Sequence, residues 1–380
     1  MKFETAAIHA GQEPEEVTGA IVVPIFQTAT YAQPAIGEHK GYEYSRTHNP
    51  TRTAMQTCLA ALEGGKYGLA FASGMAATST TMTLLQKGDH VISSDDVYGG
   101  TYRVFEKVFR EWGLEFSFVN TSDLSAIEAA VKPNTKMLWI ETPTNPLLKI
   151  TDIKGATDLA HKHNLICVVD NTFASPYFQR PLEFGADIVL HSTSKFLNGH
   201  ADVVGGALVT SDDRLHERLA FSQNAMGTIP GPFDSWLILR GMKTLGIRMR
   251  QHEANAKAVV AHLKSHKRVK QVLYPGLPEF PNHEIAKRQM SGFGSLISFY
   301  IDGGETEARS ICKSTKIFRL AESLGGVESL IEHPALMTHA SIPKSVRESR
   351  GLGDSLIRLS VGIEHADDLI ADLDQALASY

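Results

Sequence analysis

The stretch ICVVDNTFASPYFQRPLEFGADIVLHSTSK, residues 166–195, decides the fold of this chain. It contains two short apolar runs, Ile166–Val169 and Ile188–Leu190, and polar residues follow each run directly. Short apolar runs between turns are typical of strands that are buried on both faces of a parallel sheet. Ligands of such sheets bind at the carboxyl ends of the strands. We therefore expect Asp170 and Lys195, which follow the two runs, to lie at a ligand site.

The same pattern continues on both sides of this stretch. Further strand-like runs lie at Gly68–Ala72, His90–Ser93, Glu115–Val119, Met137–Ile140 and Ala207–Val209. Segments with helical periodicity separate most of the runs, among them Met75–Leu85, Tyr102–Glu111 and Leu124–Val131. Alternation of strands and helices predicts an α/β fold, in which helices cover both faces of a mostly parallel sheet.

One helix is predicted in detail ahead of the first strand. Asn49 and Pro50 are typical of a helix N-cap and first helical position. The side chains that follow form one apolar stripe with helical spacing, made of Met55, Cys58, Leu59 and Leu62. Gly64 and Gly65 then end the helix.

Composition excludes several classes of function. Hydrophobic residues make up 43% of the chain and charged residues 21%, and the net charge of -5 gives no basic field for nucleic acid or anionic membranes. No apolar run reaches the roughly 18 residues of a membrane span, and Met1–Thr5 lacks the apolar core of a signal peptide. The cysteines have neither disulfide nor zinc spacing. We expect a cytoplasmic protein with buried, reduced thiols and no metal site.

Three strand ends carry the chemistry, and each also has an ordinary structural interpretation. Ala72–Ala77 opens into a helix whose amides can bind an anion, or it is a simple strand-to-helix turn. A buried Asp170 needs a cation such as a protonated pyridine nitrogen, or else it caps the next turn. Lys195 follows a buried strand amid the hydroxyls of Ser192 and Ser194, whereas most lysines are solvated.

The three elements together are more specific than any one of them. A phosphate site, a carboxylate for a ring nitrogen and a lysine that forms a Schiff base occur in that order. Their combination indicates pyridoxal 5'-phosphate (PLP) as the cofactor. A nicotinamide dehydrogenase is a rival reading of an α/β pattern, but the Gly-x-Gly-x-x-Gly fingerprint is absent. A non-catalytic scaffold is another, and it leaves these side chains without a shared purpose.

The domain limits are predicted from the positions of proline and glycine along the chain. Residues 1–45 are interrupted by Pro24 and Pro34 and predict an irregular N-terminal arm that contacts a partner subunit. Gly227-Thr-Ile-Pro-Gly-Pro232 predicts a hinge. Residues 46–232 then form the PLP-binding domain and residues 233–380 a smaller α+β domain. In the latter, helical structure runs from Asp234 to about His266, and strand-like runs lie at Leu296–Ile301, Phe318–Ala321 and Leu356–Ser360.

The chain resembles the Cys/Met-metabolism PLP enzymes along almost its whole length. The resemblance extends from Tyr44-Ser-Arg46-Thr-His-Asn-Pro-Thr-Arg52 to Arg358-Leu-Ser-Val-Gly-Ile-Glu364. It implies the PLP-dependent transferase fold of the aspartate-aminotransferase type (fold type I). It also implies a homotetramer of two dimers that share active sites. Tyr44 and Arg46 match a pair that reaches the cofactor phosphate from the neighbouring subunit.

The resemblance also implies roles within the chain's own cofactor site. Backbone amides of Gly74 and Met75 and the hydroxyls of Ser192 and Ser194 bind the phosphate. The family usually has threonine just before the lysine, and Ser194 keeps the hydroxyl.

Further matches surround the ring and the substrate. Tyr98, in Asp96-Val-Tyr98-Gly-Gly, matches a tyrosine that stacks on the ring and helps to move protons or activate the leaving group. Asn145 matches a residue near the phenolic oxygen of the cofactor. Arg358, helped by Ser323, matches the clamp for the substrate α-carboxylate.

Positions that bear on the substrate favour cystathionine. Glu43, Arg103 and Glu322, with a contribution from Arg46, match residues that hold the distal charges of a long zwitterion. In methionine γ-lyases a cysteine typically stands two residues after the stacking tyrosine, where this chain has Gly100, so methionine γ-lyase activity is a minor alternative. Glu322 disfavours a β-lyase. We expect γ-elimination of cystathionine to cysteine, 2-oxobutanoate and ammonia. γ-Replacement, as in cystathionine γ-synthases, is the alternative because it shares the machinery.

Overall fold

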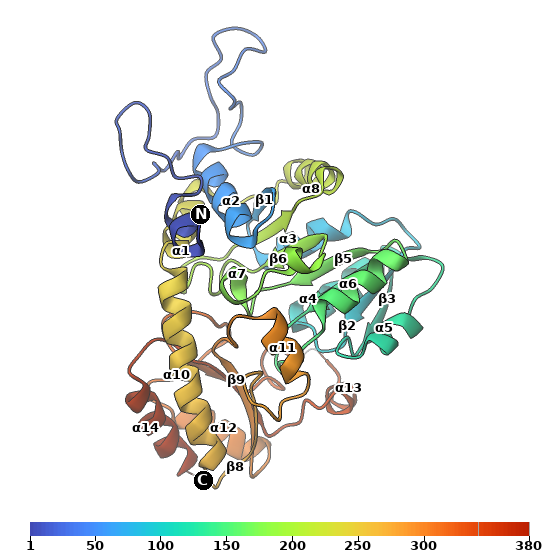
Figure 1. Ribbon diagram of the computed structural model, residues 1–380, viewed down its shortest axis with the longest axis vertical. Coiled ribbons are helices and arrows are strands. Elements are labelled where there is room, and N and C mark those ends of the chain that lie inside the picture. The colour runs from blue at the N-terminus through green and yellow to red at the C-terminus, as the bar shows by residue number, and fades with distance from the viewer. Residues whose placement is uncertain (341, 380) are drawn as a thin grey trace.

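The computed structural model describes residues 1–340 and 342–379, and among them it forms a seven-stranded and a five-stranded sheet (Figure 1). The larger sheet has the order β1-β7-β6-β5-β4-β2-β3. Its strands are β1 (Tyr67–Phe71), β2 (His90–Ser94), β3 (Glu115–Val119), β4 (Thr135–Glu141), β5 (Ile166–Asp170), β6 (Ile188–His191) and β7 (Gly206–Thr210). Only β7 runs against its neighbours, so the other strands of this sheet end at one edge.

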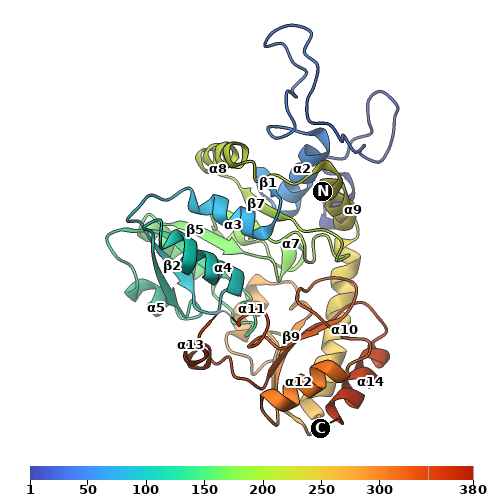
Figure 2. The same cartoon turned by 180° about the vertical axis from the view of Figure 1, so that it is seen from behind.

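Helices cover both faces of the larger sheet (Figures 1 and 2). They are α2 (Pro50–Glu63), α3 (Gly74–Met82), α4 (Gly99–Val104), η1 (Phe105–Phe109), α5 (Leu124–Ala129), α6 (Ile153–Lys162), α7 (Ser175–Phe178), η2 (Pro181–Phe184) and α8 (Asp213–Met226). Adjacent strand residues belong to different apolar clusters: Trp139 packs in one and Leu138 in another. The continuous apolar runs are explained by this burial on both faces.

The smaller sheet has the order β10-β11-β12-β9-β8 and is mostly antiparallel. Its strands are β8 (Val269–Leu273), β9 (Leu296–Ile301), β10 (Arg319–Leu320), β11 (Leu330–Glu332) and β12 (Leu356–Ser360). The helices of this part are α9 (Pro232–Met242), α10 (Leu245–Ser265), α11 (His283–Gln289), α12 (Glu305–Ser314), α13 (Lys344–Ser349) and α14 (Ala366–Leu377). The long α10 runs beside both parts of the molecule in Figure 1.

The predicted helix caps and strand runs are confirmed. The Asn49 side chain accepts hydrogen bonds from Thr51 N and Arg52 N at the start of α2, and Gly64 ends that helix with a φ of 73°. Each predicted run of the larger sheet coincides with a strand to within two residues at either end.

One expectation about local structure is wrong, one is confirmed with an added detail, and two strands were missed. The N-terminal arm is not wholly irregular, because α1 (Phe3–His9) buries Ala6 and Ala7 against α2. Helical structure from Asp234 to about His266 is confirmed, with an interruption at Lys243 and Thr244 between α9 and α10. Strands β8 and β11 were not expected, because polar residues interrupt the apolar residues of β8 and because β11 has only three residues. The domain limits themselves stay a prediction.

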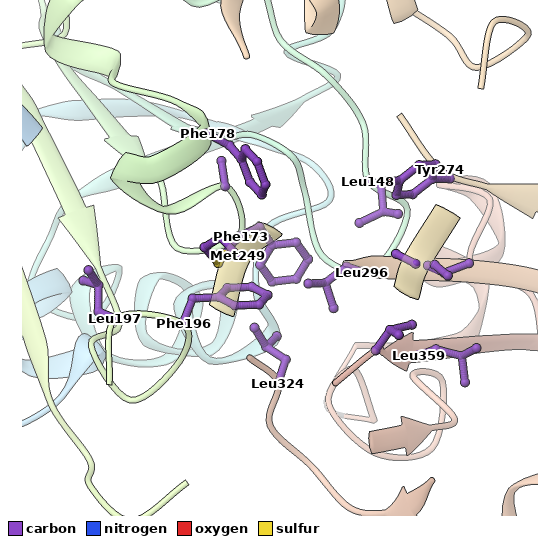
Figure 3. Close-up of a cluster of buried hydrophobic side chains, with 14 of the residues drawn as sticks. Leu148, Phe173, Phe178, Phe196, Leu197, Met249, Tyr274, Leu296, Leu324 and Leu359 are labelled. Atoms are coloured by element: carbon purple, nitrogen blue, oxygen red, sulfur yellow. The ribbon is translucent and has the colours of Figure 1, made fainter. Parts of the chain in front are cut away.

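A shared apolar cluster joins the two parts of the molecule. Phe173, Phe196, Met249 and Leu324 lie close together in it (Figure 3). Gly325 approaches Phe196 so closely that a Cβ would lie 2.6 Å from the Phe196 backbone nitrogen, and its φ of +76° also favours glycine. This contact brings the residues before Gly325 next to Lys195. None of the helices in the described ranges has the length and apolar character to cross a bilayer.

Candidate active site

A cavity of about 690 Å³ lies where the strands of the larger sheet end and the smaller part of the chain faces them. The ends of β1 and β6 contribute Gly74, Met75, Ser192, Ser194 and Lys195 to its wall. The remaining predicted residues in the wall are Tyr98, Asn145, Asp170, Glu322, Ser323 and Arg358. The structure thus brings most of the predicted site together from segments far apart in sequence.

Lys195 is half-buried in the wall of this cavity. Its Nζ donates a hydrogen bond to Ser323 Oγ at 2.8 Å. The pKa of Lys195 is lowered to about 8, mainly by burial and also by the nearby Arg358 guanidinium, whereas the charges of Glu332 and Glu322 oppose the shift. Ser323 has a φ of 101°, unusual for a residue with a side chain. A nucleophile or a general base must be unprotonated, and the lowered pKa makes the neutral amine more available than it is in an ordinary lysine.

The lowered pKa predicts how cofactor attachment depends on pH. Only the unprotonated amine attacks an aldehyde, so the rate at which PLP attaches to the apoprotein should rise as pH increases through about 8 and then level off. Stopped-flow absorbance from pH 6 to 10 measures this rate. A rate that still rises at the highest pH measured, toward the ordinary lysine pKa of about 10.4, would contradict the assignment.

Asp170 lies at the carboxyl end of β5 with one carboxylate oxygen engaged. Oδ1 accepts hydrogen bonds from Thr172 N at 3.0 Å and from Thr172 Oγ1 at 2.6 Å. Burial raises the pKa of Asp170, while the Thr172 hydrogen bonds lower it. Among residues 1–340 and 342–379, Oδ2 has no hydrogen-bond partner and the side chain forms no ion pair, although Asp170 lines the cavity. Such a buried carboxylate fits a cationic ring nitrogen.

The opposite end of the cavity fits a phosphate. Ser73 caps α3 by accepting a hydrogen bond from Ala76 N at 2.9 Å. The backbone amides of Gly74 and Met75, at the start of the helix, stay available to an anion. A Cβ on Gly74 would lie 3.0 Å from Ser192 Cβ, so a glycine keeps this corner open. Ser194 Oγ accepts a hydrogen bond from Gly205 N at 2.9 Å, which anchors the segment that carries Lys195.

Arg358 is held in a buried network on β12. Its Nη1 donates to Asn145 Oδ1 at 2.8 Å and contacts Glu332 Oε1 at 3.0 Å, and its Nη2 donates to Ser323 O at 2.8 Å. Arg358 and Glu332 are 2% and 1% exposed, so this ion pair is almost fully desolvated. Thr338 Oγ1 donates to Glu332 Oε1 at 3.0 Å. The network fixes a guanidinium in the cavity wall, where it can bind a carboxylate.

Tyr98 is positioned by glycines and by Glu141. Its backbone nitrogen donates to Glu141 Oε2 at 2.9 Å, and burial raises the pKa of its phenol. A Cβ on Gly100 would lie 2.4 Å from Tyr98 Cε1, and a Cβ on Gly99 would lie 2.2 Å from Thr338 O. A side chain at either position would therefore displace its neighbour.

Four predicted residues do not line this cavity. Arg46 Nη1 donates to Asn224 O at 2.8 Å, Glu43 pairs with His39 at 2.7 Å, and Tyr44 lies under the Arg46 guanidinium. Glu43 and Tyr44 belong to the N-terminal arm, whose loops project from the rest of the chain (Figure 2), and Arg46 directly follows this arm. Arg103 lies on α4, and its charge lowers the pKa of Tyr98.

Sequence reasoning missed Glu141, Thr172 and Glu332. Glu141 directly follows the apolar run Met137–Ile140, so the strand-end argument that singled out Asp170 also applied to it. Glu332 ends β11, whose apolar part is only Leu330 and Ile331, too short to mark a strand in the sequence.

Comparison with known proteins identifies the family. The family described as "Cys/Met metabolism PLP-dependent enzyme" matches residues 4–378. A cystathionine β-lyase of Coxiella burnetii is 54% identical over 99% of this chain and 97% of its own length. A cystathionine γ-synthase of Mycobacterium bovis is 53% identical over 98% of this chain and 96% of its own. The structure of a cystathionine γ-lyase from Lactobacillus plantarum, complexed with L-serine, superposes with a TM-score of 0.98 and 51% identity, covering 100% of this chain and 99% of that one.

The chain belongs to the Cys/Met-metabolism family of PLP-dependent enzymes. The predicted fold class, cofactor and enzyme class are thereby confirmed. The relatives carry three different activity names at nearly equal identity, so the substrate and reaction must be argued from the cavity.

Proposed function

We propose that this enzyme is a cystathionine γ-lyase, which converts L-cystathionine and water to cysteine, 2-oxobutanoate and ammonia. The observation that carries the proposal is the position of Glu322 in the wall of the cavity that also holds Arg358 and Lys195. Arg358 suits the α-carboxylate of the substrate, and Glu322 suits the distal amino group of a long zwitterion. A substrate with a neutral side chain has no use for that carboxylate.

The cavity residues divide the reaction between them. When bound, the cofactor supplies a conjugated ring that stabilises negative charge on the substrate carbon next to the amine. The Lys195 amine then takes the proton from that carbon, and Ser323 orients the amine through its 2.8 Å hydrogen bond. After it has given up the first proton, the same Lys195 amine can take a second proton from the β-carbon, before the γ-substituent departs. Because its raised pKa keeps the Tyr98 phenol protonated, Tyr98 can donate a proton to the departing sulfur.

The cofactor site is proposed to be completed by a second copy of the chain. Tyr44, Arg46 and Glu43 do not line their own cavity, and Arg46 is bound to Asn224 of α8 instead. We infer that Tyr44 and Arg46 reach the phosphate of a neighbour, in a homotetramer of two such dimers. Buried, free cysteines also support a reducing, cytoplasmic location.

γ-Synthase activity is the second candidate, because the same residues serve γ-replacement. Product analysis separates the two reactions. The purified enzyme is given cystathionine alone, and then an O-acylhomoserine with cysteine. Formation of 2-oxobutanoate and cysteine from cystathionine, at a higher kcat/KM than cystathionine formation, is the expected result. Predominant cystathionine synthesis would replace the proposal with γ-synthase, and pyruvate with homocysteine would replace it with β-lyase.

Gly100 provides a prediction about the leaving-group side of the cavity. In Gly100→Ala the new methyl meets the Tyr98 ring, so kcat/KM for cystathionine should fall by about 10²-fold, as expected for a misplaced catalytic group. Gly353→Ala is the matched control, since its Cβ would meet nothing closer than 3.8 Å. Steady-state kinetics of both variants test this, and equal effects would argue against a role for the Gly100–Tyr98 contact.

A further inference from the structure

Glu141 is a buried carboxylate in the cavity wall that sequence reasoning did not assign. It is the last residue of β4 and is paired in register with Asp170, the last residue of β5. Paired residues of neighbouring parallel strands point to the same face of the sheet. Both side chains line the cavity, and Glu141 is only 4% exposed. Two carboxyl groups therefore face one space from adjacent strands.

Both oxygens of Glu141 hold parts of the candidate site. Oε2 accepts a hydrogen bond from Tyr98 N at 2.9 Å, and Oε1 accepts one from Asn145 N at 2.9 Å. These two backbone positions belong to the segments that follow β2 and β4. Glu141 thus connects the residue proposed to stack on the ring with the residue proposed to lie near its phenolic oxygen.

The charges around Glu141 leave room for a cation. Burial raises its pKa well above the ordinary value, and the negative charges of Asp170 and Asp96 raise it further, while the Tyr98 and Asn145 hydrogen bonds lower it. Arg358, on β12, also feels its charge, but that guanidinium is paired with Glu332. In the described part of the chain Glu141 forms no ion pair. Two neighbouring carboxyl groups do not both ionise without a cation, and a cation between them favours the ionised form of both.

We propose that Glu141 is a positioning residue of the cofactor site, whose charge acts with that of Asp170 to favour a protonated ring nitrogen. It would do so while it fixes the backbone of Tyr98 and Asn145. The proposal rests on the PLP site and is independent of whether the reaction is elimination or replacement.

The test compares PLP with its 1-deaza analogue, in which C–H replaces the ring nitrogen. The full-length protein is freed of cofactor, and dissociation constants for both compounds are measured by fluorescence quenching. The ratio of the two constants reports the preference for the ring nitrogen. Glu141→Gln, which removes the charge but keeps the size, should reduce this preference by about tenfold, the effect of one pKa unit.

Two further variants separate charge from position. Glu141→Asp keeps the charge but shortens the side chain. It should therefore preserve the preference for the ring nitrogen while it weakens the binding of both compounds to the same extent. It also stands in if Glu141→Gln does not fold. Asp372→Asn is the control for loss of a buried carboxylate, because Asp372 accepts backbone hydrogen bonds from Lys316, Ile317 and Phe318 in the smaller part of the chain. It should leave the preference unchanged.

The outcomes are distinct. An unchanged preference in Glu141→Gln, whether or not both affinities fall, would overturn the proposal, as would a lost preference in Glu141→Asp. Asp170→Asn should abolish the preference. If it does not, the ring-nitrogen assignment of Asp170 fails, and that result is separate from the identity of the substrate.

Discussion

Lys195→Ala should abolish covalent attachment of PLP and lower turnover of cystathionine by at least about 10³-fold. The physical reason is that one amine has two proposed roles: it attaches the cofactor and it removes the substrate proton, and a positioned acid or base alone contributes roughly 10²- to 10⁴-fold. The absorbance band of the lysine-bound cofactor near the visible range should disappear. Borohydride reduction followed by peptide mapping should find the pyridoxyl group on Lys195 in the parent enzyme and on no lysine in the variant.

Lys149→Ala is the matched control. Lys149 is also partly buried, but its Nζ pairs with Asp95 at 3.0 Å, and it does not line the cavity. We expect that variant to keep the pyridoxyl adduct. Its turnover should change only slightly, because a partly exposed ion pair contributes little. An adduct on another lysine in the parent enzyme would refute the proposed mechanism.

Arg358→Met should impair both activity and stability, for two different reasons. Loss of the guanidinium removes the partner of the substrate carboxylate, so kcat/KM should fall on the order of 10²- to 10³-fold. The same change leaves Glu332 buried without its cation, which should lower the free energy of unfolding by about 3–5 kcal/mol. Steady-state kinetics and denaturant unfolding measure the two effects.

A second substitution separates the two losses. Glu332→Gln removes the stranded charge and retains an acceptor for Thr338 Oγ1, so the double variant with Arg358→Met should recover much of the lost stability. Its activity should stay low, because the carboxylate clamp is still missing. Recovery of activity together with stability would show that Arg358 serves the fold and not the substrate.

The sequence predicted the larger sheet well because its strands are buried on both faces. Continuous apolar runs such as Ile166–Val169 leave little ambiguity about burial, and polar residues at their ends mark the ligand edge of the sheet. Asp170 and Lys195 could therefore be placed before any coordinates. Glu141 lay within reach of the same argument and was overlooked.

The smaller sheet was less predictable because its strands have mixed character. β8 has two exposed residues in its middle and only one fully buried residue, and β11 contains only three residues. Glu332, at the end of β11, pairs with Arg358 on the neighbouring strand β12. This contact depends on tertiary structure and leaves no signal in the local sequence. The arm was predicted to be irregular, yet tertiary packing against α2 stabilises the short α1.

The order in which the cavity wall occurs along the chain has a consequence for biosynthesis. Gly74, Asp170 and Lys195 emerge from the ribosome well before Ser323 and Arg358, which come near the end of the 380 residues. Domains made first generally fold first. A nascent polypeptide can thus form the binding pocket for the vitamin B6 aldehyde early, whereas the residues that bind the amino-acid substrate are synthesised late.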